Sequence, residues 1–256
     1  MTAMTTAQVS NAQETEEKTV MPATARLYIG VVIALGFSLL AGCLSFQGQF
    51  PDLPRYFTYL LLALFASTLK VRLPGITGTM SVNFLFILIG IADLTLAETL
   101  TMGCAATVIQ CMWRTRRRPR LVQVTFNIAA LILSIGVAYQ VSHFVLALAR
   151  TESLCTLLVL AACLYFASNT LLISGVLCLV EGKPLKKIWQ QCYLWTFPYY
   201  LVGSAIAGLV GVSSRAVGWE FSMLILPLMY LVYLFYRLYL GRVANDTEQL
   251  AAKTAA

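Results

Sequence analysis

Histidine, charged residues and paired cysteines are scarce in this sequence, and each shortage excludes a class of function. The chain has one histidine, His143, so two-histidine metal sites, bis-histidine haem and HExxH peptidase chemistry are excluded within it. The seven cysteines form no CxxC pair, and we interpret them as buried, inert thiols. The sequence also lacks a GxSxG elbow and a Walker loop. We therefore expect no enzyme activity, no catalytic residue, no metal site and no cofactor.

The low charge content indicates a membrane protein. Charged residues make up 11% of the chain, against about 25% in an average soluble domain, and 59% of the residues are hydrophobic. Apolar runs recur at the length of about 20 residues that a helix needs to cross a bilayer core. The net charge of +7 does not indicate nucleic-acid binding, because most basic residues lie in short loops between apolar runs. We predict a multi-pass protein of the cell membrane.

Eight apolar segments follow a polar amino-terminal stretch. We expect residues 1–26 to be a disordered cytoplasmic tail, residues 27–242 to form an all-α, polytopic transmembrane helix bundle, and residues 243–256 to be a short cytoplasmic tail. Two of the segments, the second and the third, are short for a membrane span. The predicted segments are 27–46, 56–69, 80–92, 96–113, 122–148, 153–179, 192–212 and 221–236.

The positions of lysine and arginine predict the orientation of these segments. Of the 18 basic residues, Arg55, Arg150 and Arg215 fall on the outer side when the amino terminus is inside, and the other 15 fall in the cytoplasm. This bias follows the positive-inside rule and places both termini in the cytoplasm. Residues 71–83 contain helix-breaking Pro and Gly, so we expect a loop that is buried in protein or lines a wet cavity. The short segments beside it either cross fully or form a re-entrant pair.

Two carboxylates, Asp93 and Glu98, stand at the predicted outer face in almost wholly apolar surroundings. The spacing of Thr95 and Glu98 matches the S/T-x-x-E capping box, which predicts a capped turn between two helices. The alternative is a binding site, because His143 lies at a similar predicted depth to Glu98. A histidine and carboxylate pair there would sense pH or bind a cation from outside.

Amides form a second polar layer near the predicted inner face. Hydrogen bonds between helices explain amides inside a membrane, and a cavity for a small ligand is the alternative. The residues concerned are Asn83, Gln110, Asn127 and Asn169.

Basic residues in two cytoplasmic loops are candidates for binding anionic lipid head groups, although orientation alone also explains them. The residues concerned are Arg116, Arg117, Arg118, Lys186 and Lys187. The LAGC stretch that ends at Cys43 resembles a lipoprotein cleavage box, but the acidic leader and the later spans favour an unprocessed chain. Gly203, Ala207 and Gly211 lie four residues apart, which predicts a helix-packing face within the bundle or between protomers.

Three stretches carry a resemblance to a known family: LPGITGTMSVNFLFILIG (73–90), ETLTMGCAATVIQCMW (98–113) and RPRLVQVTFN (118–127). Together they resemble the amino-terminal membrane module of bacterial signalling proteins whose cytoplasmic HD-GYP or GGDEF domain degrades or makes cyclic di-GMP. The chain ends soon after Arg242, so we expect that catalytic domain to be missing. The resemblance implies a membrane sensor that signals through its last helix to a second copy or to a cytoplasmic partner. The LPG stretch is also similar to vitamin-binding S subunits of energy-coupling-factor transporters, which implies a small-solute-binding transporter subunit as the alternative.

Overall fold

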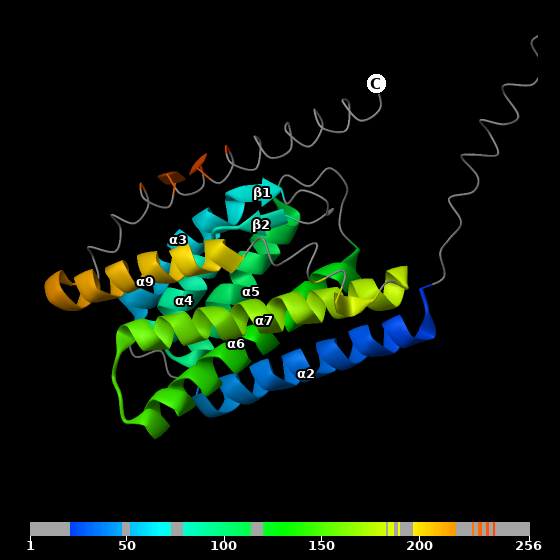
Figure 1. Cartoon of the computed structure of the whole chain (residues 1–256), viewed down its shortest axis with the longest axis horizontal. Coiled ribbons are helices and arrows are strands. Elements are labelled where there is room, and N and C mark those ends of the chain that lie inside the picture. Colours follow the sequence, from blue (N-terminus) through cyan, green and yellow to red (C-terminus); the bar gives the residue numbers. More distant parts are fainter. Residues whose placement is uncertain are drawn as a thin grey trace, which may run out of the picture.

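The protein is seen here as a computed structural model that describes residues 21–47, 52–72, 79–113, 120–182, 184–186, 189 and 197–218, with positions 227, 230, 231, 234, 235 and 238. The helices are α2 (Ala23–Gln47), α3 (Leu53–Thr68), α4 (Phe84–Asp93), α5 (Leu96–Met112), α6 (Leu121–Ala149), α7 (Leu154–Glu181) and α9 (Phe197–Val217). Two short strands, β1 (Lys70–Arg72) and β2 (Thr79–Ser81), pair antiparallel between α3 and α4. The predicted helical fold is confirmed for this part of the chain, and the strand pair is an addition to it (Figure 1).

The predicted apolar segments coincide with these helices, with shifts at their ends. The helix α2 begins at Ala23 rather than Leu27, and α4 begins at Phe84 because Met80 belongs to β2. The seventh segment begins as a helix at Phe197. The eighth segment, 221–236, lies mostly outside the described residues, so the eight-segment topology stays a prediction.

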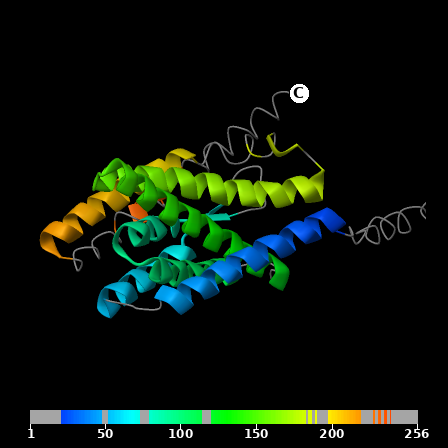
Figure 2. The same ribbon diagram turned by 90° about the horizontal axis from the view of Figure 1, so that it is seen from below.

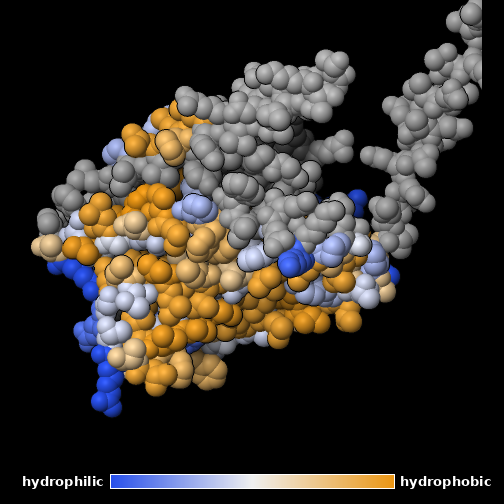
Figure 3. Space-filling model, in the orientation of Figure 1, coloured by the Kyte–Doolittle hydropathy of each residue, from blue (hydrophilic) through white to orange (hydrophobic). Residues whose placement is uncertain are grey.

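Within the described ranges, four helices are long and apolar enough to cross a membrane: α2, α6, α7 and α9. The helices α4 and α5 are apolar but shorter. Hydrophobic side chains cover much of the face that α2, α6 and α7 form in Figure 3. Large hydrophobic side chains of these helices are exposed, among them Phe144 and Leu148 of α6. An apolar surface of this extent is compatible with hydrocarbon as the surrounding solvent.

The centre of the bundle is α4, a helix that is buried on every side. All its residues from Phe84 to Ile91 are buried, and it contacts α3, α5, α6, α7 and α9. A helix that is hydrophobic all round belongs inside a protein, since it has no polar face to turn toward water. Ten residues give a length of about 15 Å, half of the roughly 30 Å hydrocarbon core. The neighbouring helices therefore shield α4 from both lipid and water.

Helices that follow one another in the chain alternate in direction, so that one end of the bundle gathers several helix ends. The start of α3 meets the end of α4 through Arg55 and Asp93, and the last turns of α6 meet the α4–α5 connection through Tyr139 and Leu94. The end of α9 meets the start of α7, where Gly211 packs on Leu154. We call this the Asp93 end. The topology prediction places it outside the cell.

The packing face predicted for the seventh segment lies inside the bundle. Gly203 faces Phe84 of α4 so closely that a β-carbon at residue 203 would lie 2.2 Å from a ring atom. Ala207 is buried, and Gly211 lies against Leu154 of α7. Small residues at this spacing thus let α9 approach α4 and α7, as they do in other membrane helices. The predicted packing face therefore lies within the bundle of one protomer and not between protomers.

We predict that Gly203→Ala lowers the thermal unfolding midpoint of the purified protein in detergent. The new methyl group would overlap the Phe84 ring, and overpacking of this kind costs about 1–3 kcal/mol, more than the helix propensity that alanine adds. Gly208→Ala in the same helix is the matched control, because its β-carbon would lie 3.5 Å from Leu158, an ordinary contact. Equal midpoints for the two variants would contradict the tight contact between α4 and α9.

Candidate functional site

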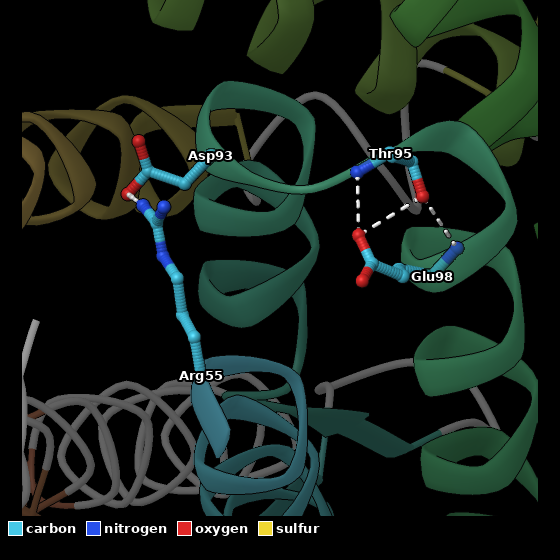
Figure 4. A network of polar contacts seen from close by, with 4 residues as sticks. All are labelled: Arg55, Asp93, Thr95 and Glu98. Carbon is cyan, nitrogen blue, oxygen red and sulfur yellow. Dashed lines mark hydrogen bonds and ion pairs between the residues drawn. The ribbon is translucent and has the colours of Figure 1, made fainter. Parts of the chain in front are cut away.

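The Asp93 end holds an ion pair between two helices. Arg55 Nη2 lies 3.1 Å from Asp93 Oδ2, and the two side chains are 24% and 4% exposed (Figure 4). Arg55 stands in the first turn of α3, where the Asp52 carboxylate caps the helix by accepting a hydrogen bond from the Arg55 amide at 3.2 Å. Asp93 is the last residue of α4. The pair therefore fixes the start of α3 against the end of α4.

Each charge of this pair sits at an unfavourable helix end. Asp93 adds negative charge to the carboxyl end of α4, which already carries the negative end of the helix dipole. Arg55 adds positive charge to the amino end of α3, where the dipole is positive. Because neither charge is stabilised by its own helix, each depends on the other. The Tyr59 ring adds a favourable contact, with its centroid 5.8 Å from Arg55 Cζ.

Burial sets the energetics of the pair. Asp93 follows the third predicted span, and burial raises the pKa of its carboxyl above the ordinary value, while the positive charges of Arg55 and Arg215 oppose that shift. Burial is the larger effect. Taking two charges out of water then costs about as much as their attraction returns. We infer that the pair fixes how α3 and α4 sit together and adds little net stability.

The turn after Asp93 has the predicted capping box. The Thr95 amide donates to Glu98 Oε2 at 2.8 Å, and the Glu98 amide donates to Thr95 Oγ1 at 3.3 Å (Figure 4). The capped-turn interpretation is therefore confirmed. Glu98 is 1% exposed, and its Oε1 has no hydrogen-bond partner. The positive end of the α5 dipole stabilises this buried carboxylate.

His143 and Glu98, the alternative pair considered from the sequence, are not joined by an ion pair in the described part of the chain. The carbonyl of Tyr139 can only accept, so His143 Nδ1 donates to it at 2.9 Å, and the two rings stack with centroids 4.3 Å apart. The Tyr139 hydroxyl donates to the Leu94 carbonyl at 3.3 Å and lies within electrostatic reach of Glu98. In the described part of the chain, the ion pair is that of Arg55 and Asp93. Tyr139 thus lies between the ring of His143 and the turn that holds Glu98.

The four predicted amides differ in their surroundings. Asn83 is buried at the start of α4, and its Oδ1 has no partner. Asn127 is exposed on α6 and donates a long hydrogen bond of 3.8 Å to Cys111 Sγ of α5. Gln110 and Asn169 are half-buried in α5 and α7. Asn83 is therefore the one amide of this layer that is buried in the interior of the bundle.

The predicted lipid-binding residues fall mostly outside the described part of the chain. Lys186 is described and exposed, shortly after the end of α7. The residues outside the described ranges are Arg116, Arg117, Arg118 and Lys187. Within those ranges, no group of three or more His, Cys, Asp or Glu side chains is placed to hold a metal ion.

The ion pair of Arg55 with Asp93 and the contacts of Tyr139 were not predicted from the sequence. One signal was present: both Arg55 and Asp93 fall at the predicted outer boundary, and a carboxylate in apolar surroundings needs a cation. Three arginines satisfy that condition, so the partner itself was not identifiable. A signal for Tyr139 was also present, because it stands four residues before His143, a spacing at which side chains of one helix contact each other.

The comparisons with known proteins identify no relative. No family model, no curated protein and no solved structure matches the chain. The likeness to cyclic di-GMP signalling membrane modules and to transporter S subunits stays a prediction.

We predict that Arg55 and Asp93 are energetically coupled by about 0.5–3 kcal/mol, the range for side chains in direct contact. Single Arg55→Met and Asp93→Asn variants each leave the partner charge at an unfavourable helix end, whereas the double variant leaves neither. The unfolding free energies of the four proteins in detergent give the coupling. Glu152→Gln, at an exposed carboxylate of the same end, is the control. Additive effects of Arg55→Met and Asp93→Asn would rule out the coupling.

Proposed function

We propose that the chain is an integral membrane sensor module that transmits a signal between the two faces of the membrane and has no catalytic activity of its own. The observation that supports this most is the position of α4. Its last residue, Asp93, forms the ion pair at one end of the bundle, and its first residue, Phe84, packs on α9 at the other. A change at the Asp93 end therefore has a direct route to the start of α9.

The contact of α4 with α9 is aromatic and close. The Phe84 ring lies 4.7 Å from the Tyr199 ring and 4.8 Å from the Tyr200 ring, measured between centroids. Tyr200 also contacts Phe166 of α7 at 5.2 Å. Closely packed protein interiors shift between discrete arrangements rather than deform continuously. A displacement of α4 along its axis would therefore move the start of α9 with it.

The topology that this proposal uses has eight segments, two of them short, with both termini in the cytoplasm of a bacterium. The alternating helix directions support it, as does the scarcity of cations at the Asp93 end, where only Arg55, Arg150 and Arg215 are predicted. The signal would leave through the last segment, 221–236, toward a second copy of the chain or a cytoplasmic signalling partner.

A small-solute-binding transporter subunit is the second candidate. Its support is a set of buried polar atoms without a hydrogen-bond partner, a costly state that a bound solute would relieve. The buried atoms concerned are Asn83 Oδ1 just before α4, Glu98 Oε1 and Thr107 Oγ1 in α5, and Ser174 Oγ in α7. Mass spectrometry of the purified protein tests this candidate, because a transporter subunit of this kind would retain a small metabolite.

We predict that Asp93→Asn changes the distance between spin labels at positions 121 and 202 by about 1–2 Å, the size of helix shifts in known switches. Both positions are exposed, at the starts of α6 and α9, far from Asp93. The labels are introduced in a background without native cysteines, and the distance is measured by double electron–electron resonance in liposomes. Glu152→Gln is the control and should leave the distance unchanged. An unchanged distribution in Asp93→Asn would remove the basis of the transmission proposal.

A further inference from the structure

A groove of about 380 Å³ lies between α2, α6 and α7. It is lined by Tyr28, Leu133, Val137, Ser168, Leu171 and Leu172. Four of these side chains are aliphatic, and its volume lies within the range of ligand pockets in proteins. The groove is thus suited to an apolar molecule.

The groove exists because α2 contacts α6 and α7 at different places along its length. It approaches α6 at Gly36, where a β-carbon would lie 2.8 Å from Ala129. It contacts α7 where the Tyr28 hydroxyl donates to the Leu172 carbonyl at 3.1 Å. Gly175 makes room for that tyrosine, because a β-carbon there would lie 2.6 Å from its hydroxyl oxygen. Tyr28 therefore contributes both to the groove and to the contact of α2 with α7.

The three helices that line the groove, α2, α6 and α7, lie side by side (Figure 2), and each is long and apolar enough to span a membrane. Val137 is 41% exposed and Leu171 is 45% exposed. A molecule that reaches this groove comes from the hydrocarbon of the bilayer. The aliphatic chain of a lipid has the matching chemistry.

Positive charges stand beyond one end of the groove. Arg26 is exposed two residues before Tyr28, and Arg120 is exposed just before α6, which starts beside α2 because Tyr28 and Phe126 pack together. Lys186 is exposed shortly after α7, which runs back to the same end. Among the described residues, the ion pair is that of Arg55 and Asp93, so none of these three cations is paired with a described carboxylate. The cations can therefore meet an outside anion.

The distances along the helices fit a lipid with its head group at these cations. Leu133 stands 13 residues after Arg120, which corresponds to about 20 Å along α6. Half of a hydrocarbon core is about 15 Å thick. The groove therefore lies at the depth of the acyl chains while the cations lie near the head groups.

We propose that this groove is a binding site for an anionic phospholipid of the leaflet at which α2 begins. One acyl chain occupies the space over Leu133 and Val137, and the phosphate lies near Arg26 and Arg120. The lipid would fill the gap between α2 and α7 that their contact at Tyr28 leaves. This proposal stands independently of the sensor and transporter candidates, because it uses neither α4 nor the ion pair.

Native mass spectrometry of the full chain tests the site. The protein is loaded in detergent with phosphatidylglycerol or with phosphatidylcholine of the same acyl chains, and the lipid that stays bound is counted. We predict preferential retention of phosphatidylglycerol. Arg26→Gln and Arg120→Gln should each weaken that retention about fivefold, since a cation near a lipid surface contributes on the order of 1 kcal/mol. Val137→Phe, which fills the groove, should reduce the retention of both lipids.

The controls separate a built site from lipid that coats any membrane protein. Arg150→Gln removes an exposed cation at the Asp93 end, and Val159→Phe enlarges an exposed side chain of α7 outside the groove. Both should retain phosphatidylglycerol as the wild type does. Equal retention of the two lipids, or equal losses in the controls, would mean adventitious lipid only and would overturn the proposal. The two arginine variants lie on the exposed surface and keep the test valid if Val137→Phe does not fold.

Discussion

The architecture depends on the length of α4. Ten residues make a helix of about 15 Å, which cannot cross a hydrocarbon core of roughly 30 Å or leave its ends there without partners. Other helices therefore surround it, and protein groups complete it at both ends. Asp93 meets Arg55 at one end, and the paired strands β1 and β2 precede it at the other. Gly203 lets α9 approach Phe84 closely, and α9 thereby helps to enclose α4.

Features that depend on neighbouring residues were predictable from the sequence. The capping box was identified because both of its hydrogen bonds join Thr95 to Glu98, three residues away. The helices matched the apolar segments because a continuous hydrophobic run of this length indicates a helix. The small residues of α9 indicated close packing, although their spacing did not show whether the neighbour was α4 or another protomer.

Features that depend on contacts between distant residues were not predictable. The Arg55–Asp93 pair joins residues 38 positions apart (93 − 55), and the Tyr139–Leu94 hydrogen bond spans 45 positions. Such contacts follow from the order in which helices pack, which hydrophobic pattern alone does not determine. The direction of the His143 ring depends on a local hydrogen bond instead. The His143 Nδ1 donates a hydrogen bond to the carbonyl of Tyr139, four residues earlier. This local bond stacks the histidine ring on Tyr139 rather than turning it toward Glu98.

The position of α2 has a consequence for how the protein assembles. Only 17% of the apolar window of α2 is buried, and its main buried residues, Ile29 and Val32, belong to a small cluster with Phe126, Ala129 and Ala130. The larger core around α4 draws its fully buried side chains from α3 to α9. The core around α4 therefore hardly requires α2. This helix can dock onto the rest of the bundle after that core has formed.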